Sequence, residues 1–379
     1  MTLTSSAQQS ITTPVATGKL SSYCDISYCP NPLTTTRFSM PSQQFWLSPA
    51  VHPVYARLVY AELLRQGLSA EQIQTDIPLD WSALLHSNQF LSLSNLQSLL
   101  LNAMALSDCP WLGFAVGMHT DVSAHGPAGY AAVTAPTIGE AISLTEQYTS
   151  LRQHLAAFRL ESSQPPVLVL DELRMPEAIR EYLLGHFTTA LLRLLETLGG
   201  QPLNSAIRID WPLPKPCWAK EIEGYAGEWR YGADALRIYL PAGLLQQDCL
   251  GADAQACQQA LRDCANQLHR QQRGGTLTER IKQRLLQTGQ GFPTLPEMAE
   301  HEHVTARTLI RHLRNEGTHY QHILDNLRSE QASWLLVHTE LSIESIAERL
   351  GYQDTSNFSR TFRRWHGCTP RLYRTQYQR

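Results

Sequence analysis

The stretch SIESIAERLGYQDTSNFSRTFRRWHGCTPRLYR, residues 342–374, is the most informative part of the chain. It has the pattern of a short helix, a tight turn, a second helix rich in arginine, and a closing helix. Gly351 suits the left-handed backbone conformation that a tight turn requires. Phe358, Phe362 and Trp365 recur at helical spacing, so they predict the buried face of the second helix.

A similar unit precedes this one, so the pattern occurs twice. The first copy is LPEMAEHEHVTARTLIRHLRNEG at residues 295–317, and the second spans residues 343–367. In each copy a small side chain, Ala299 or Ala347, allows the second helix to cross the first closely, as in helix-turn-helix motifs. The second helices are expected to start eight residues after these alanines, at Arg307 and Thr355.

The turn of the first unit differs from that of the second. His303 stands where the second unit has Gly351. Because histidine adopts the left-handed conformation less readily than glycine, we expect a looser first turn. The buried face of the helix that follows is predicted to consist of Leu309, Ile310 and Leu313. Thr305 and Thr355 suit the N-caps of the two second helices.

The remaining faces of the two second helices are polar and basic. Reading the major groove of DNA needs a helix that presents a few donors near its N-terminal half, with flanking charges on phosphates. A solvated basic face is the alternative for one unit alone, but two units in tandem favour DNA. We predict base contacts from Arg307, Thr308, Arg311, Ser356, Asn357 and Arg360, and phosphate contacts from Thr305, Arg314, Thr355, Ser359, Arg363 and Arg364.

The segment between the units supports the same interpretation. Residues 319–339 predict a helix whose twenty-one residues span roughly 30 Å at ~1.5 Å each. One turn of B-DNA is about 34 Å. A helix of this length suits two recognition helices in successive major grooves.

Charge is distributed unevenly along the chain. The 379 residues carry 31 Lys+Arg and 34 Asp+Glu, a net charge of −3. Residues 276–379 hold 14 and 11 of these, a net of +3, which leaves 17 and 23, a net of −6, for the rest. From Thr355 onward there are six arginines and no acid. A local basic end on a non-basic protein indicates a polyanion-binding region.

The N-terminal part has a mixed pattern. Residues 1–44 are rich in Ser, Thr, Gln and Pro and predict a disordered arm. Residues 45–250 alternate helical and strand patterns and predict one α/β domain. Strands are expected at 157–162, 167–172, 206–211 and 235–240, and helices include 92–106, 137–156 and 176–198.

Residues 251–272 predict a helix, and residues 273–275 a linker to a C-terminal domain that begins at 276. Cys257, Leu261, Cys264 and Leu268 form a short apolar seam on this helix. Two interpretations stay open: the seam packs against its own domain, or it forms a dimer contact. The eight cysteines show no CxxC spacing and no zinc-type cluster, so we expect a reducing compartment and no metal.

The second unit resembles the signature of the AraC/XylS family of bacterial transcription regulators. The resemblance covers about residues 276–378 and rests on Gly351-Tyr352, Phe358-Ser359-Arg360, Phe362-Arg363-Arg364, Gly367 and Pro370. It implies an all-α C-terminal domain with two helix-turn-helix units joined by a linker helix. It also implies contacts with double-stranded promoter DNA, contact with RNA polymerase, and an activator in preference to a repressor.

Upstream, WLGFAVGMHTDVSAHGPAGYAAVTAPTIGEAI at residues 111–142 resembles the α/β sensor domain of one branch of that family, in regulators of ornithine use and quorum sensing. This weaker resemblance implies a domain that binds an effector and dimerises. Candidate effector contacts are Tyr130, Tyr148, Arg152 and His154, with surface or core packing as the alternative for each. Arg152 suits a carboxylate, as in an amino acid or a fatty acid.

Two other classes of function fit the sequence less well. An enzyme fused to a DNA-binding module is disfavoured, because the chain has no GxSxG, P-loop, HExxH or GxGxxG motif. No cofactor and no catalytic residue is predicted. A DNA-binding regulator without an effector is the alternative that stays open. The absence of a signal-like or membrane-spanning stretch predicts a cytoplasmic location without membrane contact, and the resemblance implies a homodimer.

Overall fold

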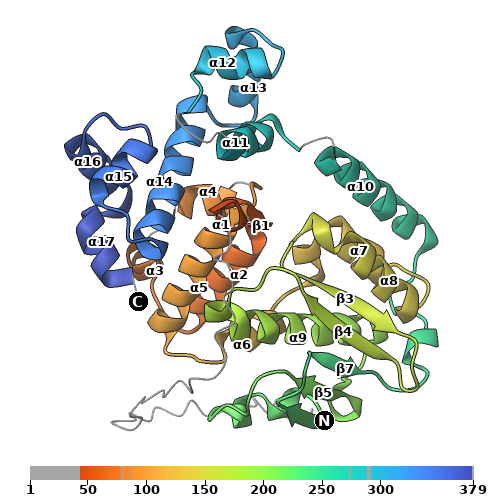
Figure 1. Ribbon diagram of the computed structural model, residues 1–379. Coiled ribbons are helices and arrows are strands. Elements are labelled where there is room, and N and C mark those ends of the chain that lie inside the picture. Colours follow the sequence, from red (N-terminus) through yellow and green to blue (C-terminus); the bar gives the residue numbers. More distant parts are fainter. Residues whose placement is uncertain are drawn as a thin grey trace, which may run out of the picture. The chain divides into compact units, whose positions relative to one another are not determined.

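The computed structural model describes residues 43–377, apart from 78, 80, 87, 273–274 and 288–291. A mixed α/β region precedes an all-helical C-terminal region, as the sequence predicted (Figure 1). Nearly all of the predicted arm at 1–44 lies outside the described residues. So does most of the predicted linker at 273–275.

A five-stranded sheet lies in the N-terminal region, with strand order β3-β4-β7-β5-β6. Neighbouring strands are antiparallel except for β5 and β6, which run parallel. The sequence predicted four of these strands and missed β6. Exposed and half-buried residues alternate along β6, so its sequence lacks the buried apolar side chains that predict a core strand. The strands are β3 (Ala156–Glu161), β4 (Val167–Glu172), β5 (Arg208–Trp211), β6 (Glu228–Tyr231) and β7 (Arg237–Tyr239).

The long helix α9 (Glu177–Gly199) contributes to two hydrophobic cores. Its C-terminal leucines, such as Leu195, pack with the sheet residues Ile209 and Ile238. Its N-terminal residues, among them Leu183, pack with the α2–α5 helices. The helices of this second core are α2 (Val54–Arg65), α3 (Ala70–Asp76), α4 (Trp81–His86) and α5 (Leu93–Ser107), preceded by α1 (Gln43–Leu47) and accompanied by the short strands β1 (Pro49–Val51) and β2 (Leu91–Ser92).

Glycines allow α6 (Leu112–Met118) to cross α9 closely. A Cβ on Gly113 would clash with the backbone of Tyr182, and a Cβ on Gly117 would clash with Thr189. The hydroxyl of Thr189 donates to the carbonyl oxygen of Phe114 at 2.9 Å. The glycine-rich stretch of the sequence therefore encodes a helix crossing.

The helix predicted at 137–156 is shorter than expected. Thr137 caps α8 (Ile138–Tyr148) by accepting a hydrogen bond from the Glu140 amide, as its pattern indicated. A 3₁₀ turn, η2 (Thr149–Leu151), follows, and β3 begins at Ala156. The connection is extended because the His154 amide donates to the carbonyl oxygen of Ala50. A tertiary contact thus ends the helix.

The apolar face of α10 (Ala254–Gln272) packs within its own chain. Cys264 is fully buried in a cluster with Ala128 of α7 (Pro127–Val133), Tyr148 and Leu151. Cys257 is also buried, and its thiol lies 3.7 Å from the carbonyl oxygen of Ala131. Of the two interpretations of this seam, the structure supports packing against its own domain.

The C-terminal region consists of helices that share one connecting helix. The N-terminal half of α14 carries Ile323 and Leu327 into the core of the first unit, and its C-terminal half carries Leu335 and Leu336 into the core of the second. The helices are α11 (Leu277–Gln287), α12 (Leu295–His301), α13 (Ala306–Asn315), α14 (Tyr320–His338), α15 (Ile343–Arg349), α16 (Thr355–His366) and α17 (Pro370–Tyr377).

No single helix within the described ranges is long and apolar enough to cross a membrane. The helices α5 and α6, which are bent by 102° relative to each other, pass that test together by length and composition. Leucines of both helices belong to the second hydrophobic core.

Candidate nucleic-acid interface and buried cavity

The turns of the two helix-turn-helix units have the same hydrogen bonds. His303 has φ +55° and Gly351 has φ +80°, both in the left-handed region. In the first turn the amides of His303 and Val304 donate to the carbonyls of Glu300 and Ala299, each at 3.0 Å. The corresponding amides at 351 and 352 donate to 348 and 347, each at 2.9 Å. The expectation of a looser first turn is therefore wrong; histidine adopts the glycine conformation here.

The recognition helices are α13 and α16, and their caps differ. Thr305 caps α13 by accepting a hydrogen bond from the Thr308 amide, as predicted. Asp354, and not Thr355, caps α16 by accepting from the Asn357 amide. The caps are 49 positions apart, whereas the left-handed residues of the turns are 48 apart, so the second turn is one residue longer. The first recognition helix, α13, begins at Ala306 and not at Arg307, where the sequence placed its start.

This register brings the predicted DNA contacts into equivalent pairs. With an offset of 49, Arg311 corresponds to Arg360 and Arg314 to Arg363, and all four side chains are exposed. In both helices the pairs lie on the face opposite the buried residues Leu309 and Leu313, or Phe358 and Phe362. The other equivalent pairs are Arg307 with Ser356, Thr308 with Asn357, and Thr305 with Asp354.

Ile310 does not lie on the buried face where the sequence placed it. Its side chain is 48% exposed, the most exposed large apolar residue of α13. At 100° per residue it flanks Arg307 and Arg314 on the solvent side, and it corresponds to Ser359 in α16. An apolar side chain on this face is suited to contact a thymine methyl group.

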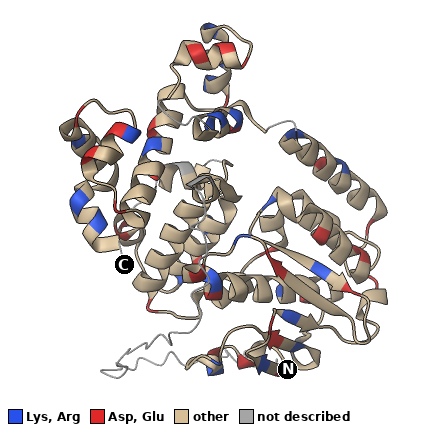
Figure 2. Cartoon of the chain, in the orientation of Figure 1, with Lys and Arg blue, Asp and Glu red and all other residues tan. Residues whose placement is uncertain are grey.

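Helices α13, α16 and α17 carry arginines and no acid, whereas acidic and basic residues are interspersed over most of the other described elements (Figure 2). Not every arginine there is free to contact DNA. The guanidinium of Arg374 donates to the carbonyl oxygens of Leu336 and Leu341, at 3.2 and 2.6 Å. Arg374 therefore holds the end of α14 in place.

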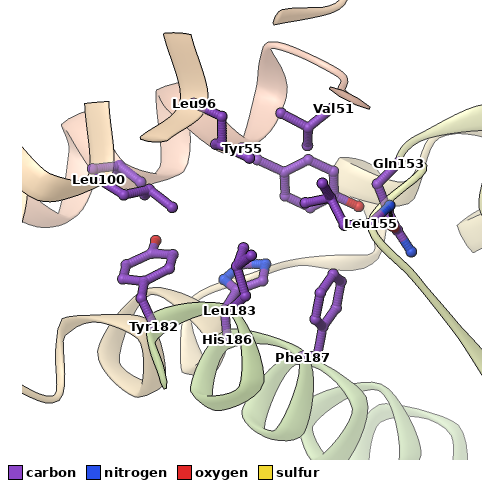
Figure 3. Close-up of a pocket in the computed structure, with 11 residues that line it drawn as sticks. Val51, Tyr55, Leu96, Leu100, Gln153, Leu155, Tyr182, Leu183, His186 and Phe187 are labelled. Atoms are coloured by element: carbon purple, nitrogen blue, oxygen red, sulfur yellow. Dashed lines mark hydrogen bonds between the residues drawn. The ribbon is translucent and has the colours of Figure 1, made fainter. Parts of the chain in front are cut away.

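A buried apolar cavity of about 20 Å³ lies in the N-terminal region between α2, α5 and α9. Tyr55 of α2 and Leu96 of α5 face Tyr182 and His186 of α9 across it (Figure 3). The ring of His186 is 5% exposed, and its Nδ1 has no hydrogen-bond partner among the described residues. Burial lowers the pKa of His186 to about 3, so this imidazole is neutral at pH 7.

A second, more polar cavity of about 30 Å³ shares Tyr55 with the first. Its lining includes Tyr148 and Arg152, two of the four predicted effector contacts. The other two lie elsewhere: Tyr130 is 54% exposed, and the ring of His154 stacks on Phe90. The sequence did not single out three residues of these two cavities: Tyr55, His125 and His186.

Arg152 brings one positive charge into the lining of the polar cavity. Burial, and then the charge of Arg152, lower the pKa of His125 to about 4. Nδ1 of this histidine lies 3.3 Å from the Tyr55 hydroxyl, so the tyrosine can donate to it. Burial also lowers the pKa of Arg152 itself. His125 could have been found from its place in the glycine-rich stretch that resembles a sensor domain. Tyr55 could not, because nothing in the pattern of α2 distinguishes it from a core residue.

Comparisons with known proteins agree with both parts of this description. The domain family described as "Arabinose-binding domain of AraC transcription regulator, N-term" matches residues 67–249, and a family described as "Helix-turn-helix domain" matches residues 298–376. The ornithine utilization regulator of Pseudomonas aeruginosa is 31% identical over 336 residues, covering 84% of this chain and 95% of that protein. The transcriptional activator NphR of Rhodococcus sp. is 36% identical over 86 residues, 23% of this chain and 26% of that protein. A solved structure, that of the transcriptional regulator CdpR from P. aeruginosa, aligns over 85% of this chain and 98% of its own at 26% identity, with a TM-score of 0.43.

Proposed function

Because the chain belongs to the AraC family of transcription regulators, we propose that it reads a promoter with α13 and α16 under the control of a small molecule bound in its N-terminal domain. The observation that carries the proposal is the equivalence of the two recognition faces. Each presents a central arginine, Arg311 or Arg360, and a flanking arginine one turn later, Arg314 or Arg363. A structural role for these exposed charges would not require the same register twice.

In the proposed complex both heads bind one face of the duplex. The connecting helix α14 has 19 residues and spans about 28 Å at ~1.5 Å each. This length suits recognition helices that enter major grooves about 34 Å apart. In this proposal the base contacts come from Arg307, Thr308, Arg311, Ser356, Asn357 and Arg360. The phosphate contacts come from Thr305, Arg314, Thr355, Ser359, Arg363 and Arg364.

The proposal includes activation of transcription through RNA polymerase. It is supported by the name of NphR, a transcriptional activator that resembles the C-terminal region. We also propose a homodimer located in the cytoplasm, where the promoter is. The dimer contact must use a surface other than the face of α10 that carries Cys257 and Cys264, because that face is buried.

The proposed domain boundaries follow the sequence. They place an arm at 1–44, the effector-sensing domain at 45–250, a helix and linker at 251–275, and the DNA-binding domain at 276–379. A regulator without an effector is the alternative. The half-buried guanidinium of Arg152, whose Nε has no hydrogen-bond partner among the described residues, favours an effector over that alternative, because burying a charge is costly unless an anion accompanies it.

Binding of the full chain to its promoter fragment tests the proposal. An electrophoretic shift should show a specific complex that weakens as salt rises. Arg311→Ala and Arg360→Ala should each cost about 1–3 kcal/mol of binding free energy, and their combination should abolish the specific complex. Arg230→Ala, at an exposed site on β6, is the control. Unchanged binding by the double variant would refute the assigned contacts.

A further inference from the structure

Arg152 is a half-buried cation whose guanidinium lacks a counterion. Its Nε is buried without a hydrogen-bond partner, and no carboxylate of the described residues forms an ion pair with it. The guanidinium lies against Gly126, where a Cβ would clash with it. A charged group removed from water in this way destabilises the protein unless a partner of opposite charge is bound. The missing partner is an anion.

The carboxylates nearest to the cavities are already engaged. Asp121 accepts a hydrogen bond from the Ser123 amide at 2.9 Å, and with Arg193 it lines a third pocket, which shares His125 and Leu194 with the polar cavity. Glu62, close to Tyr182, pairs with Arg65 and accepts from Gln66 at 3.0 Å. Neither carboxylate lines the two cavities that share Tyr55. A ligand with a free ammonium group would therefore find no carboxylate in the lining of these two cavities.

The apolar cavity indicates the rest of the ligand. Beyond Tyr55, its walls are mostly apolar and include Leu96 and Leu100 of α5 and the rings of Tyr182 and Phe187 of α9, with Gln153 at one side (Figure 3). On the proposed function of an effector-controlled regulator, we propose that Arg152 binds the carboxylate of an effector whose apolar tail extends past Tyr55 into this cavity. The effector is thus a monocarboxylate with an apolar tail, not a diamino acid such as the one that the name of the ornithine utilization regulator indicates.

The cavities are small in this structure. At about 20 and 30 Å³, each has room for roughly one water molecule. Binding must therefore widen them, which is within the side-chain rearrangements that accompany ligand binding. Tyr55 stands between the two cavities, so a turn of its ring would join them.

The position of Arg152 also links the site to α10. Tyr148 and Leu151, on the same turn as Arg152, are packed against Cys264 of α10. This helix ends at Gln272, just before the DNA-binding region. An anion bound to Arg152 therefore contacts the turn that packs against α10, the helix that leads to the DNA-binding region.

Thermal unfolding of the full chain with defined probes tests the inference. We expect butanoate, hexanoate and octanoate to raise Tm progressively, whereas octanol, octylamine and ornithine at equal concentrations leave it unchanged. Arg152→Gln should weaken octanoate binding about 10- to 100-fold, the loss of one charge-assisted interaction. In the absence of ligand the same variant should be as stable as the wild type or more stable, because it removes an uncompensated charge.

Arg174→Gln is the matched control. Arg174 is also half-buried, but its guanidinium donates to the carbonyl oxygen of Pro49 at 3.1 Å and to the Ser48 hydroxyl at 2.7 Å. Its loss should lower Tm without changing the octanoate response. A purely structural role for Arg152 would instead make Arg152→Gln behave like Arg174→Gln.

Three results would overturn the inference: no carboxylate raises Tm, ornithine or octylamine raises it, or octanoate protects Arg152→Gln as well as the wild type. Promoter binding measured on the same samples separates this outcome from failure of the proposed function. A wild-type chain that binds its promoter but ignores carboxylates refutes only the ligand class. A chain that binds octanoate through Arg152 but no promoter DNA refutes the regulatory function.

Discussion

Arg328, in the middle of α14, donates from Nε to the carbonyl oxygen of Leu350 at 3.1 Å. Leu350 caps the end of α15, directly before the turn at Gly351. The guanidinium also lies over the rings of Phe292 and Tyr352, 5.1 and 5.4 Å from their centroids. One side chain of the connecting helix thus holds the turn of the second head and contacts the segment that precedes α12.

Arg328→Ala should destabilise the protein by about 1–3 kcal/mol, because a half-buried carbonyl oxygen loses a charged donor and two rings lose a cation. Promoter binding should weaken with it, since the orientation of α16 depends on this turn. Denaturant unfolding and an electrophoretic shift measure the two effects. Arg371→Ala, at an exposed position on α17, should leave stability unchanged. Equal stability of both variants would contradict the role of Arg328.

Ile310 should contribute to sequence preference. Replacing it with alanine should weaken binding about 3- to 10-fold on the best site, through the loss of apolar contact with a thymine methyl group. On DNA in which uracil replaces the contacted thymine, wild type and Ile310→Ala should bind equally. Titration of both proteins with both DNAs measures this coupling. Additive effects of the two changes would show that Ile310 and the methyl group do not meet.

The two left-handed turn residues should respond oppositely to substitution. His303→Gly should stabilise the protein by up to about 1 kcal/mol, because glycine adopts φ +55° without steric strain. Gly351→Ala should destabilise it by about 1–2 kcal/mol for the converse reason. Thermal unfolding measures both changes. Gly224→Ala is the control, because Gly224 does not have a positive φ and a Cβ there meets no atom within 4 Å.

Arg363 and Arg360 should have different effects on DNA binding. Arg363→Ala should weaken binding to all sequences similarly and reduce the slope of log affinity against log salt by about 1, as expected for a lost phosphate contact. Arg360→Ala should instead relax the preference for one base pair, at a cost of about 1–3 kcal/mol. Affinities measured at several salt concentrations on a set of single-base variants distinguish the two. Identical behaviour of both variants would contradict the division into base and phosphate contacts.

Buried neutral histidines should make stability fall as the solution is acidified. The folded-state pKa values of His186 and His125 are lowered to about 3 and about 4, whereas an unfolded histidine titrates near 6.5. Between pH 6.5 and 4 the unfolded chain binds protons that the folded chain does not, so the free energy of unfolding decreases as pH falls.

His186→Gln should reduce the slope of this dependence by up to about 1.4 kcal/mol per pH unit. Urea unfolding at several pH values measures the slope. His86→Gln, at an exposed position, is the control and should leave it unchanged. A slope that persists in full in His186→Gln would show that this imidazole is already protonated in the folded protein.

Local patterns in the sequence were sufficient to predict the C-terminal helices and the faces that carry Arg311 and Arg360. A short stretch of about ten residues encodes helical periodicity, a small residue at the helix crossing and a cap, so these features can be predicted without knowledge of the tertiary structure. The same locality predicted Thr305 as a cap and α9 between its proline and glycines. It failed for Ile310, because a helix face is assigned by spacing alone and the neighbours of α13 decide which edge of that face is covered.

The N-terminal cavity depended on tertiary structure. Tyr55, His125 and Arg152 are far apart in the sequence, and only the packing of α2, α7 and η2 brings them to one cavity. The sequence by itself determined that the chain carries two helix-turn-helix units with arginine-bearing second helices, whereas the common register of those helices followed from the structure, because it depends on a second turn that is one residue longer. Only the folded structure decided that Arg152 is half-buried with its Nε unpaired, because burial and pairing depend on surroundings that no local pattern contains.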